Sequence, residues 1–174
     1  MTAVDELRTR ATDSASIVHE LASWSDVAGL ALEIARGGRI AITPSLAADQ
    51  PDLVAALDRH LLEPSSEAPF YSIADVAVGI VRGVLAVAET GSVLLAQHEP
   101  ADRAVSMLSK TAIQIVDRSR VVDSLDEVAA WLAANASEVS LATLVTGPSR
   151  TADIERSLTI GVQGPANLHL VVLG

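Results

Sequence analysis

The sequence has no cysteine, and its 174 residues include only two Trp, one Tyr and one Phe. Without cysteine the chain cannot form a disulfide, use a thiol nucleophile or hold an iron–sulfur cluster through its own thiolates. Hydrophobic residues still make up 49 % of the chain, which excludes a disordered protein. The core must therefore consist of Ala, Val, Leu and Ile, a composition typical of a sheet covered by helices.

Basic residues are also scarce, because 12 Lys and Arg stand against 22 Asp and Glu and give a net charge of −10. Such a chain repels nucleic-acid phosphates and anionic membrane surfaces, although a local pocket can still attract a small anion. No apolar run approaches the roughly 18 residues of a membrane span. The charged N-terminal sequence MTAVDELRTR also lacks the apolar core of a signal peptide. We therefore expect a cytoplasmic protein with no nucleic-acid partner and no membrane span.

The spacing of apolar residues predicts helices that alternate with strands. The expected helices cover residues 4–20, 24–36, 44–61, 73–80, 100–108, 124–132 and 151–158. The expected strands cover residues 39–43, 84–89, 92–96, 110–116, 140–146 and 168–173. This alternation predicts an α/β fold with a mainly parallel sheet. It also predicts a single domain over residues 1–174, in which a helical segment, residues 1–36, packs on the rest.

The turn GPSRT is the first candidate site, because it follows a predicted strand and opens a predicted helix. Free backbone N–H groups at a helix start attract anions, and Ser149, Arg150 and Thr151 add hydroxyls and a positive charge. The alternative is purely structural. Ser149 or Thr151 then only caps the helix, and Asp153 and Glu155 complement its dipole.

Two further glycine turns carry polar residues. Gln163 and Gly164 precede the last strand, where glycine lets the backbone approach a neighbour closely, although a plain reverse turn also fits. Glu89, Thr90 and Gly91 lie between two strands, where the carboxylate is a candidate general base, nucleophile or metal ligand, or else a solvated turn residue. Because ligands of parallel sheets sit at the carboxyl ends of strands, we expect all three turns to share one cleft for a small anion.

Metal and nucleotide motifs are absent from the sequence. The four histidines, His19, His60, His98 and His169, do not have the spacing of metal ligands. The sequence contains no Walker loop and no GxGxxG pattern. We therefore expect neither a metal nor a cofactor in this chain.

Three ordered motifs resemble those of the lactate-utilisation (LUD) domain family, in its lactate-utilisation protein C or YkgG-like branch. They are AVAETGSVLL at residues 86–95, GPSRTADIE at 147–155 and GVQGPANLHLVVL at 161–173. The resemblance implies a three-layer α/β/α sandwich like that of the NagB/RpiA/CoA-transferase superfamily. Many members carry histidine in place of Gln163, and since glutamine cannot relay protons as imidazole does, only a hydrogen-bonding role is expected there.

The resemblance also implies a function, the oxidation of L-lactate to pyruvate by a multi-protein complex. This chain would be a subunit without a redox group, with a pocket for a small carboxylate such as lactate. Its partners would be cysteine-rich iron–sulfur proteins that carry the electrons. Two alternatives remain: a stand-alone enzyme like a CoA transferase or sugar-phosphate isomerase that uses Glu89, or a regulatory or scaffolding module.

Overall fold

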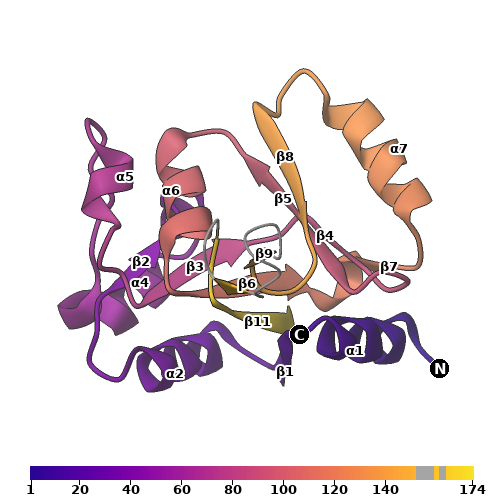
Figure 1. Cartoon of the computed structure of the whole chain (residues 1–174), viewed down its shortest axis with the longest axis horizontal. Helices are drawn as coiled ribbons and strands as arrows, with labels where there is room; N and C mark the ends of the chain where they lie inside the picture. Colours follow the sequence, from indigo (N-terminus) through magenta and orange to yellow (C-terminus); the bar gives the residue numbers. More distant parts are fainter. Residues whose placement is uncertain (152–158, 161–163) are drawn as a thin grey trace.

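The computed structural model describes residues 1–151, 159–160 and 164–174 and contains two larger sheets (Figure 1). In the first sheet all five strands are parallel. In spatial order they are β1 (Ile17–Leu21), β11 (Asn167–Leu173), β6 (Thr111–Asp117), β3 (Val78–Arg82) and β2 (Ile40–Ile42). The chain therefore brings its first strand beside its last.

The second sheet has four strands and is mostly antiparallel. In spatial order they are β7 (Val121–Val122), β4 (Leu85–Val87), β5 (Ser92–Gln97) and β8 (Leu141–Val145). Strands β4 and β5 pair antiparallel and form a hairpin, with Thr90 and Gly91 in the connection between them. The edge strand β8 pairs antiparallel with β5, whereas β7 pairs parallel with β4. A two-residue strand β9 (Arg150–Thr151) pairs antiparallel with β10 (Thr159–Ile160).

Seven α-helices surround the sheets in the described part of the chain: α1 (Ala3–Asp13), α2 (Trp24–Ala35), α3 (Pro44–Asp49), α4 (Pro51–Leu57), α5 (Pro69–Ser72), α6 (Pro100–Leu108) and α7 (Leu125–Asn135). Two 3₁₀ turns complete the set, η1 (Asp58–His60) and η2 (Arg118–Arg120). Helix α2 ends as its Gly37-Gly38 sequence predicts, with Arg36 already in the left-handed conformation. Helix α7 begins at a capping box formed by Ser124 and Glu127, close to the predicted start at residue 124. None of the described helices is long and apolar enough to cross a membrane.

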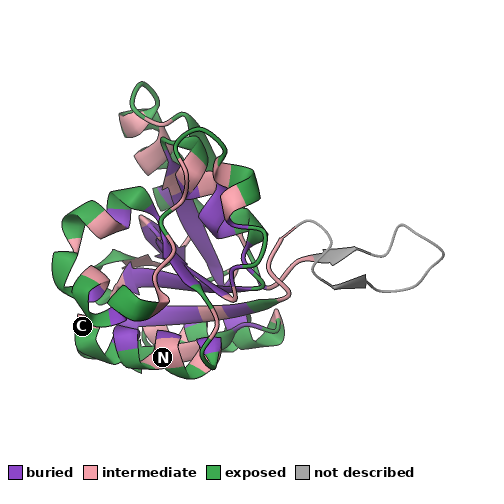
Figure 2. Cartoon of the chain, turned by 90° about the vertical axis from the view of Figure 1, so that its left-hand side faces the viewer, coloured by how far each residue is buried: buried purple, intermediate pink, exposed green. Residues whose placement is uncertain are grey.

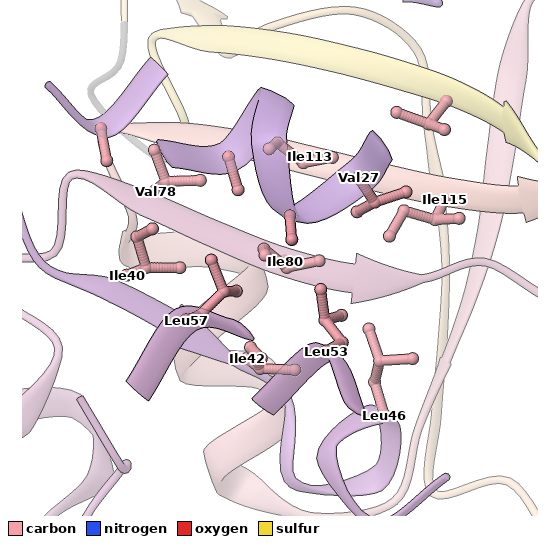
Figure 3. Close-up of a cluster of buried hydrophobic side chains, with 14 of the residues drawn as sticks. Val27, Ile40, Ile42, Leu46, Leu53, Leu57, Val78, Ile80, Ile113 and Ile115 are labelled. Carbon is pink, nitrogen blue, oxygen red and sulfur yellow. The ribbon is translucent and has the colours of Figure 1, made fainter. Parts of the chain in front are cut away.

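The strands lie in layers between the helices, and their residues make up most of the buried interior (Figure 2). One face of the parallel sheet packs under α2 and α4 (Figure 3). The close-up shows Val78, Ile80, Ile113 and Ile115 of the sheet near Val27, Leu53 and Leu57 of these helices. The opposite face packs against α1 and the second sheet, and α7 covers the far side of that second sheet. The α/β fold with a mainly parallel sheet is thus confirmed.

Two predicted helices are wrong, one in part and one over its whole length. Residues 4–20 do not form one helix, because α1 ends at Asp13 and residues Ile17–Leu21 pair with β11 as strand β1. Residues 73–80 are not a helix, because Val78 and Ile80 belong to strand β3 of the parallel sheet. The buried run of β3 looks alike in a helix and in a parallel strand, and the five residues of β1 are too few to show a period, so tertiary pairing decides in both cases.

The predicted helix over residues 151–158 has a different start in the structure. Thr151 lies in strand β9 and pairs with Thr159, so a helix does not begin there. The rest of that prediction, residues 152–158, lies outside the described residues.

Candidate functional site

A cavity of about 830 Å³ lies between the two sheets. Its floor comes from β6 and β11, and one wall comes from β5 and β8 of the second sheet. Helix α6 and the end of α1 add further lining residues, and the turn after β8 and Gly164–Pro165 complete the rim. Because of its place between the layers, we call this cavity the interlayer pocket.

Two of the predicted turns meet at this pocket. The backbone N–H of Ser149 donates to the carbonyl oxygen of Pro165 at 2.9 Å. A Cβ atom on Gly164 would lie only 3.2 Å from Cβ of Ser149, so the two turns are in close contact. Gly147 has a φ of +72°, and a Cβ there would collide with the carbonyl oxygen of Ser14 at the end of α1. Glycine is therefore required at position 147 to bring this turn against α1.

Glu89 does not line the interlayer pocket. It is exposed, and its Oε1 accepts a hydrogen bond of 2.7 Å from the backbone N–H of Leu125, the first residue of α7. The backbone N–H of Glu89 donates to the carbonyl oxygen of Asp123 at 3.1 Å. Carboxylates at a helix start satisfy free N–H groups and complement the dipole, so this geometry gives Glu89 a capping contact.

The neighbours of Glu89 also contact structural elements. Gly91 has a φ of +69°, and a Cβ there would lie 2.6 Å from the carbonyl carbon of Arg10 and 2.8 Å from Cα of Ala11. Thr90 has a buried hydroxyl without a hydrogen-bond partner in the described part of the chain. Ser92, which follows Gly91, connects this turn with the turn after β8, since its Oγ lies 2.5 Å from Oγ1 of Thr146.

The remaining predicted residues divide as follows. Ser149 and Gly164 line the interlayer pocket. Arg150 and Thr151 follow Ser149 directly, and their backbone forms strand β9. Gln163 lies outside the described residues. The structure thus brings the second and third motifs to one pocket and leaves Glu89 outside its lining.

Two buried glutamines of the pocket were not among the predicted site residues. Gln114 lies in the middle of β6 and Gln97 at the end of β5, and they are 1 % and 2 % exposed. Nε2 of Gln97 donates to the carbonyl oxygen of Asp102 at 3.2 Å and also to Oγ of Ser106. Oε1 of Gln114 has no hydrogen-bond partner among the described residues. The available signal was a single amide within the otherwise apolar strand sequence AIQIV.

A second cavity, of about 400 Å³, lies where the general rule for parallel sheets predicts one, at the carboxyl ends of β3 and β6. Arg82 and Asp117 form its polar floor through an Nη2–Oδ2 contact of 2.5 Å. Asp49 lies 3.9 Å from Nη1 of the same arginine. These carboxylates pair with Arg82, and the cavity lining also contains Arg120 and His98.

A histidine pair joins β1 and β11 at the edge of the parallel sheet. Nε2 of His19 lies 2.9 Å from Nδ1 of His169, and the rings stack with centroids 5.1 Å apart. Burial, assisted by the charge of His19, lowers the pKa of His169 to about 4. Burial also lowers the pKa of His19, against the opposing influence of Glu33. The pair is therefore uncharged at neutral pH, and no group of three potential metal ligands occurs among the described residues.

These features define the protein as an α/β domain whose parallel sheet and second, mostly antiparallel sheet enclose a pocket edged by glycine turns. The chain belongs to the LUD domain family, whose model matches residues 4–173. A crystal structure of a DUF162 family protein from Deinococcus radiodurans shares the fold, with a TM-score of 0.75 over 99 % of this chain and 96 % of that one, at 20 % identity.

Curated relatives of the chain carry the name lactate utilization protein C. The protein from Geobacillus sp. (strain WCH70) is 33 % identical over 122 residues, which cover 67 % of this chain and 51 % of that protein. The protein from Bacillus subtilis (strain 168) is 33 % identical over 100 residues, which cover 55 % and 42 % respectively. The chain thus spans about half the length of these relatives or less.

Proposed function

We propose that this chain takes part in the oxidation of L-lactate to pyruvate, as a subunit that carries no redox group of its own. Membership of the LUD domain family and the similarity to lactate utilization protein C support this role. The lack of cysteine supports a subunit without its own iron–sulfur cluster, because such a cluster needs thiolates that this chain does not have. The electrons would therefore pass through cysteine-rich iron–sulfur partner proteins.

A small carboxylate such as lactate would bind at the rim of the interlayer pocket. The observation that carries this part of the proposal is the meeting of two family motifs at that rim, where Ser149 contacts Pro165 and Gly164. The Ser149 hydroxyl is a suitable donor to a carboxylate, and Arg150 supplies a positive charge next in the sequence. The contact between Glu89 and α7 supports a capping role for that residue rather than one as nucleophile.

The complex is tested by isolating the tagged chain from its own cells under native conditions. We expect a brown eluate that contains a second, cysteine-rich polypeptide and that reduces a dye only when L-lactate is present. A colourless eluate that contains this chain alone, or a complex that ignores lactate, would overturn the proposed role.

The carboxylate site is tested in the same complex with Ser149→Ala. One lost hydrogen bond to a charged group is worth about 1.5 kcal/mol or more, so we expect the KM for lactate to rise by roughly tenfold. Ser137→Ala is the matched control, because Ser137 is exposed and lies outside the pocket lining. An unchanged KM in Ser149→Ala would remove the rim of the pocket as the lactate site while leaving the complex itself intact.

A further inference from the structure

The inner end of the interlayer pocket holds a hydrogen-bond acceptor that the described residues do not use. Gln114 stands on the central strand β6, on the opposite face from Ile113 and Ile115, which pack under α2 and α4. The residue is 1 % exposed, and its Oε1 has no partner among the described residues. Leaving a buried acceptor unpaired costs free energy, so such an atom in a cavity indicates a place where a ligand donates.

The second buried amide of the pocket offers a further acceptor. Gln97 uses its Nε2 hydrogens on Asp102 and Ser106 of α6, so what remains for a ligand is its Oε1. A ligand that brings N–H or O–H donors to this end of the pocket therefore finds two amide oxygens as acceptors.

Charge excludes an anionic group from the inner end. The only charged side chain described in the lining is Asp13, which is exposed at the end of α1. The deepest apolar walls are Leu95 and Leu168, which are 2 % and 3 % exposed. A carboxylate or phosphate placed against these walls would lose its hydration without gaining a described cation. Nearer to the solvent, Met107 and Leu144 add apolar surface that remains 47 % and 41 % exposed.

Size completes the chemical description. The volume of about 830 Å³ lies in the range of about 300–1,000 Å³ that is typical of pockets for drug-sized ligands and cofactors. Lactate at the rim leaves most of this space open. We infer that the inner end of the interlayer pocket binds an uncharged organic molecule of cofactor size, which donates an N–H or O–H hydrogen bond to Oε1 of Gln114. This binding site does not depend on the proposed role in lactate oxidation.

Riboflavin and menadione are suitable probes, because both are uncharged fused-ring molecules and only riboflavin has an imide N–H. Binding of each probe to the purified chain is measured by fluorescence or calorimetry. In Gln114→Met the side chain keeps its length and loses the amide, so riboflavin should bind roughly tenfold more weakly, the value of one hydrogen bond. Menadione should bind at least as well as before. Gln50→Met is the matched control, since Gln50 lies between α3 and α4 outside the pocket, and it should change neither affinity.

Two further measurements keep the test decisive. Gln114→Met should raise the thermal midpoint of the ligand-free chain, because it removes the unpaired acceptor. Should this variant fail to fold, Thr143→Trp on the exposed edge strand β8 places an indole at the pocket lining and should abolish riboflavin binding. Riboflavin affinity that is absent in the wild type, or equal in wild type, Gln114→Met and Thr143→Trp, would overturn the inference. Lactate-dependent dye reduction would remain a separate question in either case.

Discussion

Replacing Gly91 by alanine tests whether this motif residue serves packing or ligand binding. The sequence made Gly91 a candidate for an anion site, whereas the structure places it against the end of α1. A left-handed conformation costs an L-residue about 1–2 kcal/mol. The new Cβ would also collide with the backbone nitrogen of Ala11 and lie 2.6 Å from the carbonyl carbon of Arg10, and an overpacked site typically costs a further 1–3 kcal/mol.

The unfolded chain offsets part of this cost, since alanine has less backbone freedom than glycine by about 0.4–1 kcal/mol. We therefore expect Gly91→Ala to lower the free energy of unfolding by roughly 2–4 kcal/mol. For a chain of this length each kcal/mol shifts the midpoint by about 2–4 °C, so the thermal midpoint should fall by roughly 5–15 °C. Circular dichroism during thermal and urea unfolding measures both quantities.

Gly29→Ala is the matched control. Gly29 lies inside α2, and a Cβ there meets nothing within 4 Å. Alanine in the interior of a helix is favoured over glycine by about 0.5–1 kcal/mol, so this variant should be more stable than the wild type. The packing argument would be refuted if Gly91→Ala unfolded at the wild-type midpoint. Impaired lactate binding by a Gly91→Ala chain of unchanged stability would instead favour a ligand role.

Two other predictions concern Glu89 and the histidine pair. Glu89→Ala removes the acceptor for the Leu125 N–H and should lower the free energy of unfolding in urea by about 1 kcal/mol. Lactate-dependent dye reduction by the complex should not change. Lost activity in a variant of full stability would restore Glu89 as a catalytic candidate. The pKa of His169 is lower in the folded chain than its usual 6.5, so protons favour the unfolded state and stability should fall as the pH drops from 6.5 towards about 4. In His169→Gln the thermal midpoint should change less with pH over that range. A decline as steep as in the wild type would show that carboxylates or His19 dominate the pH dependence.

Local signals were sufficient for elements whose ends are marked by the sequence. Helix α7 begins at its capping box, and the β4–β5 hairpin turns at Thr90–Gly91. Such features depend on residues within a few positions of one another, so a sequence pattern records them directly. The two strands that were taken for helix, β1 and β3, depend instead on partners far away in the chain. Their short sequences, IVHEL and VGIVR, do not reveal which neighbour they will meet.

The site could be predicted only in its motifs. The glycine turns at Ser149 and Gly164 stood out because their residue types are unusual, and the structure places both at one pocket. Glu89 stood out for the same reason, but its contact is with the start of α7, 36 positions away, which the local sequence does not reveal. Gln114, in contrast, did not stand out in the sequence, because its significance depends on an unpaired atom at a cavity that two separate sheets enclose.

The pairing of the first strand with the last sets the order in which this fold can be completed. His19 in β1 meets His169 in β11, a separation of 150 positions, and β11 lies between β1 and β6. During synthesis, β1 therefore leaves the ribosome long before the strand that connects it to the rest of its sheet. Until then the backbone edges of β1 and β6 that face β11 have no partner, and an unpaired strand edge invites pairing with other chains. The pairing of β11, residues 167–173, with β1 and β6 is thus a late folding step, and it covers the edges that were exposed until then.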